Sequence, residues 1–201
     1  LIQGEGGYFP GHREFFMAII DVLKKNNIAV WIDEVQTFGR TSAAFAFQFF
    51  ELDEYVDVVT VGKMSQVCAT LYREGFKPRP GLVSQTFTSS TAAIRASLVI
   101  LDKLRHGGLC GEKGKIVKLH KCFEEKVKIL AGKFPGQFEG PYGLGAMCAF
   151  TIFNGDLPKT KAFANTLFDA GIISFIAGKS PTRIRFLLPV IAVTEKDIAH
   201  V

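Results

Sequence analysis

Apolar residues recur along the first half of the chain at spacings that predict one helix and two strands. Helical spacing over residues 13–25 predicts an amphipathic helix, which ends at a pair of asparagines. The continuous apolar run at 28–33 predicts a strand buried on both faces, as in a parallel sheet. Residues 43–51 then cross back to a second apolar strand at 56–61. Strand, crossover and strand together form one predicted βαβ unit.

The pattern changes in the second half of the chain. A long helix is predicted over 91–104, after which Gly107 and Gly108 interrupt the helical spacing. Beyond these glycines we expect helices at 113–132, at 158–170 and from Thr194, and strands at 137–142, 145–153, 172–177 and 183–188. The pattern therefore predicts two domains, 1–105 and 106–201, of which the second is a small α+β domain.

Composition and charge narrow the possible partners. The chain has 201 residues, 48% hydrophobic and 21% charged, which is enough to bury a sizeable core. A net charge of +5, without clustering, is too small to indicate a nucleic-acid-binding surface. Many of the lysines fall on the predicted helix at 113–132, but glutamates lie between them, which is typical of a solvated helix face. Nucleic acid is therefore not an expected partner.

The four cysteines are Cys68, Cys110, Cys122 and Cys148. They form no Cys/His set with zinc spacing, so no metal site is expected, and reduced thiols in a cytoplasmic protein are the default. No apolar run is long enough to span a bilayer, so no membrane association is expected. The chain opens with Leu-Ile-Gln and no Met, which leads us to expect that the true N-terminus lies upstream.

Charged residues follow both strands of the βαβ unit. Asp33 and Glu34 end the first strand, and Lys63 follows the second. Because ligands of open α/β sheets sit at the carboxyl ends of the strands, Asp33 and Lys63 are expected to face one crevice. A carboxylate and a lysine there have three interpretations: an ATPase, a structural ion pair, or pyridoxal phosphate (PLP) chemistry.

The residues around Lys63 disfavour the ATPase. A phosphate-binding loop needs GxxxxGK[ST], but Met64 follows the lysine and Asp57 stands where the first glycine belongs. PLP chemistry needs a lysine for a Schiff base and a carboxylate against the pyridinium nitrogen of the cofactor. From Asp33 and Lys63 alone, a structural ion pair at the sheet edge stays an equal alternative.

Three motifs resemble the class III aminotransferases, which are PLP-dependent enzymes of fold type I. They are GEGGYFPG at 4–11, IAVWIDEVQTFGRTS at 28–42 and VDVVTVGK at 56–63. The resemblance covers essentially the whole chain, more weakly in its second half, and GKMSQVCAT is similar to the lysine 6-aminotransferase branch. It implies an α/β fold in which residues 1–105 are the C-terminal part of a mainly parallel-sheet large domain and 106–201 are the small C-terminal domain.

The resemblance also implies roles around the cofactor. Asp33 would pair with the pyridinium nitrogen, Val35 would pack on the ring, and Gln36 would bond the ring hydroxyl. Lys63 would form the Schiff base and move the proton between substrate and cofactor. Thr86 would reach the phosphate of the cofactor in the partner subunit of a homodimer.

For the substrate, the resemblance implies that Arg185 binds the α-carboxylate of 2-oxoglutarate or glutamate, with Arg183 as the neighbouring candidate. Glu5 would pair with this arginine while the amine donor is bound, because one guanidinium fork can hold either carboxylate. An exposed loop charge for Glu5 and a surface position for Arg185 are the simpler alternatives. Glu34 is expected to be structural, bonding neighbouring backbone or an arginine such as Arg40.

Some family features are absent from the sequence. The Gly-Ser phosphate cradle and the aromatic residue that stacks on the ring are missing, so the chain looks like a C-terminal fragment. The resemblance implies a cytoplasmic aminotransferase that transfers a terminal amino group from a lysine-like donor to 2-oxoglutarate. Acetylornithine, ornithine and 4-aminobutyrate donors stay open, as do a decarboxylase or racemase and a catalytically incomplete relative with a structural role.

Overall fold

The computed structural model describes residues 1–82 and 90–200. It divides into two compact units, each made of more than one segment of the chain. The first unit comprises Leu1, Gly11–Gly39 and Ala43–Gly108, and the second comprises Ile2–Pro10, Arg40–Ser42 and Leu109–Val201. The segments 2–10 and 40–42 thus group with the C-terminal half of the chain, and the predicted division into domains 1–105 and 106–201 stays a prediction.

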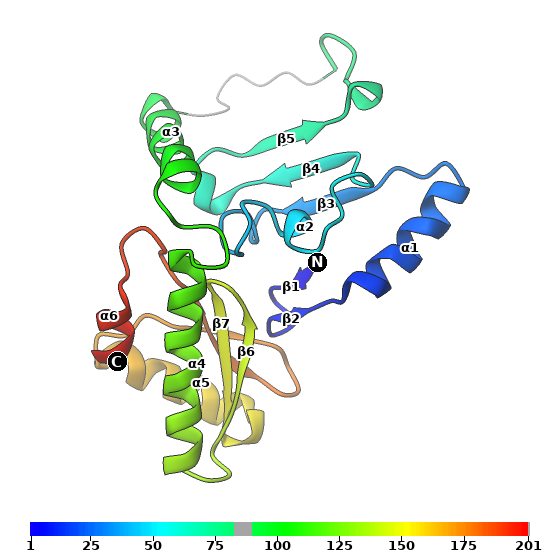
Figure 1. Ribbon diagram of the computed structural model, residues 1–201. Coiled ribbons are helices and arrows are strands. Elements are labelled where there is room, and N and C mark those ends of the chain that lie inside the picture. Colours follow the sequence, from blue (N-terminus) through cyan, green and yellow to red (C-terminus); the bar gives the residue numbers. More distant parts are fainter. Residues whose placement is uncertain (83–89, 201) are drawn as a thin grey trace. The chain divides into compact units, whose positions relative to one another are not determined.

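A three-stranded sheet forms the centre of the first unit, in the order β3-β4-β5 (Figure 1). Its strands are β3 (Trp31–Glu34), β4 (Val58–Val61) and β5 (Ala69–Tyr72). β3 and β4 are parallel, and the chain between them contains the short helix α2 (Ala46–Phe49), which confirms the predicted βαβ unit. The sequence pattern missed β5, which pairs antiparallel with β4, because all four of its residues are exposed and show no apolar alternation.

The predicted burial of the first strand on both faces is wrong for the described residues. The strand begins at Trp31, three residues later than expected, and its burial alternates along the chain. Trp31 is 66% exposed and Asp33 is exposed, whereas Glu34 is fully buried. One face of β3 therefore carries exposed side chains, and the apolar character of the sequence alone did not reveal this.

Helix α1 (Arg13–Lys25) confirms the predicted first helix. Lys24 Nζ lies 2.6 Å from Asp57 Oδ2, and the same oxygen accepts the Val30 N–H at 2.7 Å. Burial alone would raise the pKa of Asp57, but these two hydrogen bonds and the nearby positive charges outweigh it and lower the pKa. This contact holds the end of α1 against the starts of both parallel strands. The first unit also contains η1 (Lys63–Ser65), η2 (Glu74–Phe76) and α3 (Thr91–His106).

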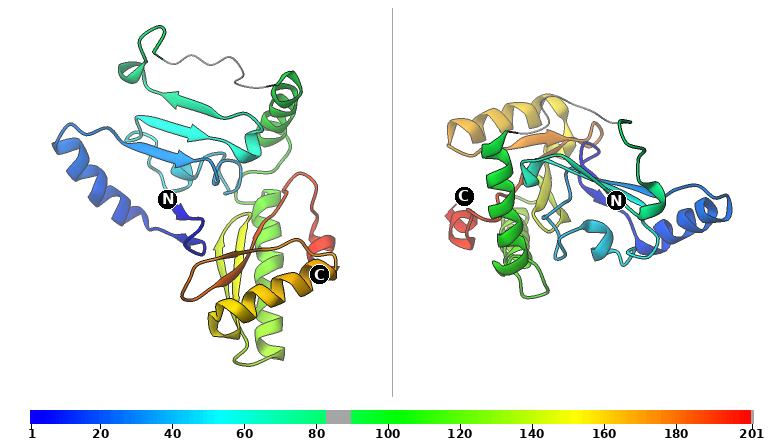
Figure 2. Two further views of the ribbon diagram at one scale, coloured as in Figure 1. Left: turned by 180° about the vertical axis from the view of Figure 1, so that it is seen from behind. Right: turned by 90° about the horizontal axis from the view of Figure 1, so that it is seen from above.

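The second unit is built on a four-stranded antiparallel sheet in the order β6-β7-β9-β8. Its strands are β6 (Phe138–Leu144), β7 (Met147–Ile152), β8 (Phe175–Ala177) and β9 (Arg183–Leu187). Its other elements are α4 (Lys115–Lys133), η3 (Phe153–Gly155), α5 (Leu157–Asp169), α6 (Glu195–His200) and the short pair β1 (Ile2–Gln3) and β2 (Phe9–Pro10). The strands and helices predicted beyond residue 108 are confirmed, with ends shifted by a few residues. Helix α4 runs along the sheet in Figure 1 and in the left view of Figure 2.

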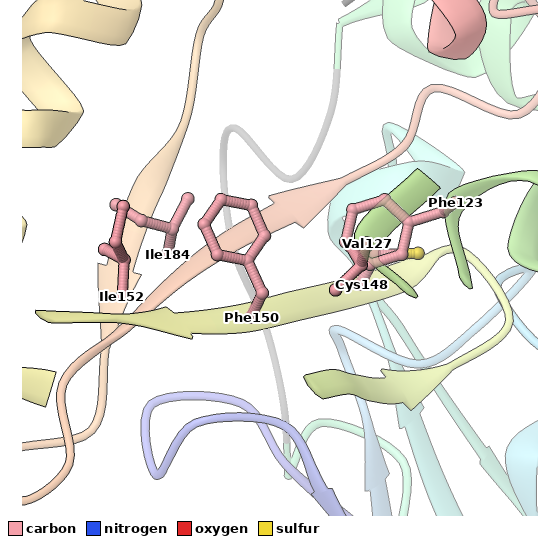
Figure 3. Packing of buried hydrophobic residues seen from close by; sticks show 6 residues of the cluster. All are labelled: Phe123, Val127, Cys148, Phe150, Ile152 and Ile184. Atoms are coloured by element: carbon pink, nitrogen blue, oxygen red, sulfur yellow. The ribbon is translucent and has the colours of Figure 1, made fainter. Parts of the chain in front are cut away.

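The core of the second unit lies between α4 and the sheet. Every residue of β7 is buried, as expected for an inner strand of the sheet. Figure 3 shows the central cluster, to which α4, β7 and β9 contribute Phe123, Val127, Cys148, Phe150, Ile152 and Ile184. Burying each large apolar side chain contributes roughly 1.5–3 kcal/mol, so this cluster stabilises the packing of α4 against the sheet. Within the described residues, no helix is long and apolar enough to cross a membrane.

Candidate functional site

The carboxyl edge of the first unit's sheet brings the predicted cofactor residues close together in register. Asp33 pairs with Thr60 across β3 and β4, and Lys63 follows the end of β4 by two positions. Both side chains are exposed. The Val35 N–H donates to Asp33 Oδ1 at 2.8 Å, which fixes the carboxylate in a local turn. The other oxygen, Oδ2, accepts no hydrogen bond from the residues that the structure describes.

Lys63 stands on a tightly held turn. It has a left-handed φ of 49°, and its carbonyl accepts the backbone N–H of Gln66 at 3.1 Å and the Gln66 side-chain amide at 3.2 Å. Gly62 is buried, and a Cβ there would lie 3.2 Å from Val35 Cγ1 and 3.4 Å from Cys68 Sγ. Val35 therefore packs directly against the turn that presents Lys63.

These residues fit the demands of PLP. The edge offers a carboxylate with one oxygen open to a cationic nitrogen, an amine on a fixed turn, and an apolar side chain packed against that turn. Gln36 follows Val35 directly in the turn after β3. Thr86 lies outside the described residues.

Glu34 points to the opposite side of β3 from Asp33. It is fully buried, and its carboxylate accepts the Ala46 N–H at 2.9 Å, the Phe47 N–H at 2.8 Å and the Thr37 hydroxyl at 2.7 Å. The predicted bonding of Glu34 to backbone is confirmed. Burial raises the pKa of this carboxyl, and the three hydrogen bonds offset part of the rise. Glu34 thus ties α2 to the strand that carries Asp33.

In the second unit, Arg185 on β9 meets Glu5 of the glycine-rich segment, residues 4–10. Arg185 Nη2 donates to Glu5 Oε1 at 2.6 Å, and Nη1 donates to the Gly4 carbonyl at 3.2 Å. The Arg185 side chain is only 11% exposed, whereas that of Glu5 is 81% exposed. Tyr8, fully buried, lies with its ring 5.6 Å from the Arg185 guanidinium, and burial raises the pKa of its hydroxyl to about 12. A nearly buried guanidinium therefore holds a carboxylate that remains open to solvent.

Arg183 has a different environment, although it also lies on β9. It is 4% exposed, and its Nη1 donates to the Gly7 carbonyl at 2.6 Å. Its guanidinium carbon lies 4.0 Å from the centre of the Phe9 ring and 3.5 Å from that of Tyr142. Of the two candidate arginines, Arg185 is the one paired with a carboxylate, and Arg183 is enclosed by aromatic rings.

From the sequence, Arg183 was expected only as a register alternative to Arg185. Residues two apart on a strand point to the same face, so the spacing of the two arginines already placed them together. The aromatic partners Phe9 and Tyr142 carried no comparable signal, because they come from two distant segments of the chain.

Comparison with known proteins identifies the family of this chain. The family model described as "Aminotransferase class-III" matches residues 1–201. The chain is 28% identical to acetylornithine aminotransferase of Archaeoglobus fulgidus, over 98% of this chain and 49% of that protein. It is 31% identical to a probable 4-aminobutyrate aminotransferase of Bacillus subtilis, over 94% of this chain and 45% of that protein.

A solved structure, the lysine aminotransferase from M. tuberculosis in the internal aldimine form, superposes with a TM-score of 0.83. It is 27% identical, and the match covers 99% of this chain and 45% of that one. The chain thus spans about half the length of the relatives it matches. Its fold is the α/β fold of the PLP-dependent transferases of fold type I. From the family match and the shared fold, the chain belongs to the class III aminotransferases.

Proposed function

We propose that the full-length protein is a PLP-dependent aminotransferase that moves a terminal amino group from a lysine-like donor to 2-oxoglutarate. The family supports the reaction class. The observation that carries the proposal is the pair formed by the nearly buried Arg185 and the exposed Glu5. A reaction that alternates an amine donor with a dicarboxylate acceptor calls for a cation whose carboxylate partner can be exchanged. The solvent exposure of Glu5 supports this role for the pair.

The residues of the first unit would hold the cofactor. When bound, PLP supplies a ring that accepts electrons from the substrate carbon. Asp33 Oδ2 would keep a proton on the ring nitrogen, while Val35 would pack on the ring and Gln36 would bond its hydroxyl. Lys63 Nζ would hold the cofactor covalently, and once released it would carry the proton to and from the substrate. Thr86 would reach the phosphate in the partner subunit of a homodimer.

The residues of the second unit would select the substrate. With the amine donor bound, Glu5 would stay on Arg185, so that the cation is not left unpaired beside an uncharged part of the donor. With 2-oxoglutarate bound, Glu5 would release Arg185 to the α-carboxylate. The enclosed Arg183 has no comparable opening to solvent, which favours Arg185 over Arg183 in this role.

The most specific part of the proposal is the identity of the amine donor. Similarity to the lysine aminotransferase from M. tuberculosis and the GKMSQVCAT segment favour lysine. The relatives named for acetylornithine and 4-aminobutyrate keep those donors as alternatives. We also propose a cytoplasmic location, in keeping with the four free cysteines.

The test is the visible absorbance spectrum of the full-length protein with PLP. Lysine should convert the band of the bound cofactor to that of its amine form, and 2-oxoglutarate should restore it. If acetylornithine or 4-aminobutyrate converts the band and lysine does not, the proposed donor is wrong and the proposed aminotransferase reaction stands. A band that no amine converts, or no band at all, would contradict the aminotransferase and favour a catalytically incomplete relative.

A further inference from the structure

Arg183 is the second charged side chain that reaches the glycine-rich segment, defined here as residues 4–10. Its guanidinium lies between the rings of Phe9 and Tyr142, with centroid distances of 4.0 and 3.5 Å. Phe9 belongs to the segment itself and Tyr142 to strand β6. Arg183 also donates to the Gly7 carbonyl at 2.6 Å. One side chain thus joins the segment to the sheet by two kinds of contact.

The backbone of the segment is shaped to receive this side chain. Gly7 has a φ of +111°, which favours glycine, and a Cβ there would lie 3.3 Å from Arg183 Cδ. The next residue, Tyr8, is fully buried and donates its N–H to the Gln3 carbonyl at 2.8 Å. The end of the segment is therefore closely packed around Arg183.

Arg183 and Arg185 hold opposite ends of the segment. They are two apart on β9 and so point to the same face of the sheet. Arg185 bonds Gly4 and the exposed Glu5, whereas Arg183 bonds Gly7 and stacks on Phe9. The Glu5 carbonyl also accepts the Gly178 N–H at 2.8 Å, so the backbone is held at that end as well. A buried guanidinium between two rings cannot exchange its partners with solvent, which leaves the exposed Glu5 side chain as the part that is free to change its partner.

We propose that Arg183 is a positioning residue that fixes the backbone of the segment, so that only the Glu5 side chain moves when Arg185 exchanges its carboxylate partner. This inference rests on the proposed function of Glu5 and Arg185. With the backbone fixed, Glu5 returns to Arg185 at each turnover and closes the carboxylate site to the amine donor. Lysine could not replace Arg183, because an ammonium does not stack between two rings as a planar guanidinium does.

The kinetic test uses Arg183→Met in the full-length enzyme. Loss of the hydrogen bond and the cation–π contacts should raise KM for the amine donor about tenfold, while KM for 2-oxoglutarate stays unchanged or falls. Lys179→Met removes an exposed charge between β8 and β9 and serves as the matched control, with both constants unchanged. In a Glu5→Gln background, Arg183→Met should change neither constant further. Equal rises in both KM values, or additive effects in the double variant, would overturn the proposal.

A second readout does not depend on catalysis. Amide hydrogen exchange in a peptide covering the segment should accelerate about tenfold in Arg183→Met and not in Lys179→Met. Phe9→Leu removes one ring at a position that is 44% exposed, so it tests the same contact if Arg183→Met fails to fold, with a smaller rise expected. Unchanged exchange in Phe9→Leu would overturn the anchoring. If Glu5→Gln alone alters neither KM, the proposed change of carboxylate partner at Arg185 is wrong. The rates of amide hydrogen exchange then still decide whether Arg183 holds the segment.

Discussion

At the sheet edge of the first unit, Asp33 and Lys63 are held by residues close to them in the chain. In the second unit, Glu5 and Arg185 meet across 180 positions of sequence. The Asp33 carboxylate is fixed by the N–H two residues on, and the Lys63 carbonyl by Gln66 three residues on. Short-range contacts fix the backbone of the first region and leave its charged groups exposed. In the second region, the contact between the charged groups depends on how the sheet is assembled.

This difference suits the two proposed tasks. A residue that holds a cofactor needs a fixed backbone, because a small displacement of the reacting group slows the reaction greatly. A residue that exchanges partners needs a contact that can open, and an ion pair with one partner 81% exposed can do so. Variants can therefore be chosen to affect one region and spare the other.

The largest effect is expected from Lys63→Ala in the full-length protein. Loss of the proton-carrying amine should lower kcat by about 10³-fold or more, since positioned acid–base groups contribute on the order of 10²–10⁴. Borohydride reduction followed by peptide mass spectrometry should find PLP attached at Lys63 in the parent protein and at no lysine in the variant. Lys161→Ala, an exposed lysine on α5, is the control and should keep full activity. A reducible adduct persisting in Lys63→Ala would refute the assignment.

The next largest effect is expected from Arg185→Ala. Loss of a charge-assisted contact to the α-carboxylate should raise KM for 2-oxoglutarate about 10- to 100-fold. The cofactor spectrum should stay as in the parent, because the residues proposed to hold PLP lie in the first unit. Steady-state kinetics with Lys179→Ala as control measure the effect. Unchanged affinity for 2-oxoglutarate would show that another residue binds the acceptor.

Glu34→Gln tests the buried support beneath Asp33. In the parent protein, the two oxygens of the Glu34 carboxylate accept hydrogen bonds from three donors. An amide keeps the shape of the side chain but replaces one of these oxygens with an NH₂ group, which donates and cannot accept. We expect the free energy of unfolding of the full-length protein to fall by about 1–3 kcal/mol, measured by urea denaturation. The exposed Glu54→Gln is the control and should leave stability unchanged. An equally stable Glu34→Gln protein would mean that the three hydrogen bonds add no net stability.

The smallest effect is expected from the pH dependence of the Lys24–Asp57 contact. The folded-state pKa of Asp57 is lowered, so its contribution is fully present above the ordinary value of 3.8 and is lost as pH falls through the folded pKa. Asp57→Asn should remove about 1 kcal/mol at neutral pH and less below pH ~4. Unfolding of both proteins followed across this range measures the difference. A difference that does not shrink on acidification would assign the effect to packing.

Some parts of the molecule followed from local sequence patterns. The helix at 13–25 and the parallel strands around Asp33 and Lys63 were predicted, because apolar spacing and strand ends are local properties. Strand β5 was missed, since its exposed residues are selected by backbone pairing with β4 and leave no apolar pattern. The expected double-sided burial of the first strand failed for a different reason: burial depends on which segments cover each face of the strand.

Taken alone, the sequence determined the reaction class to expect, the order of the elements, and the residue types available at each strand end. Motif spacing carries this information because the residues proposed to hold the cofactor, apart from Thr86, lie within two short segments, 33–36 and 62–63. Only the tertiary structure distinguished the surroundings of the two arginines of β9. Both have the same charge and face the same side of the strand, but one meets an exposed carboxylate and the other two aromatic rings. Those partners come from segments far apart in the chain, and only packing of the sheet brings them to β9.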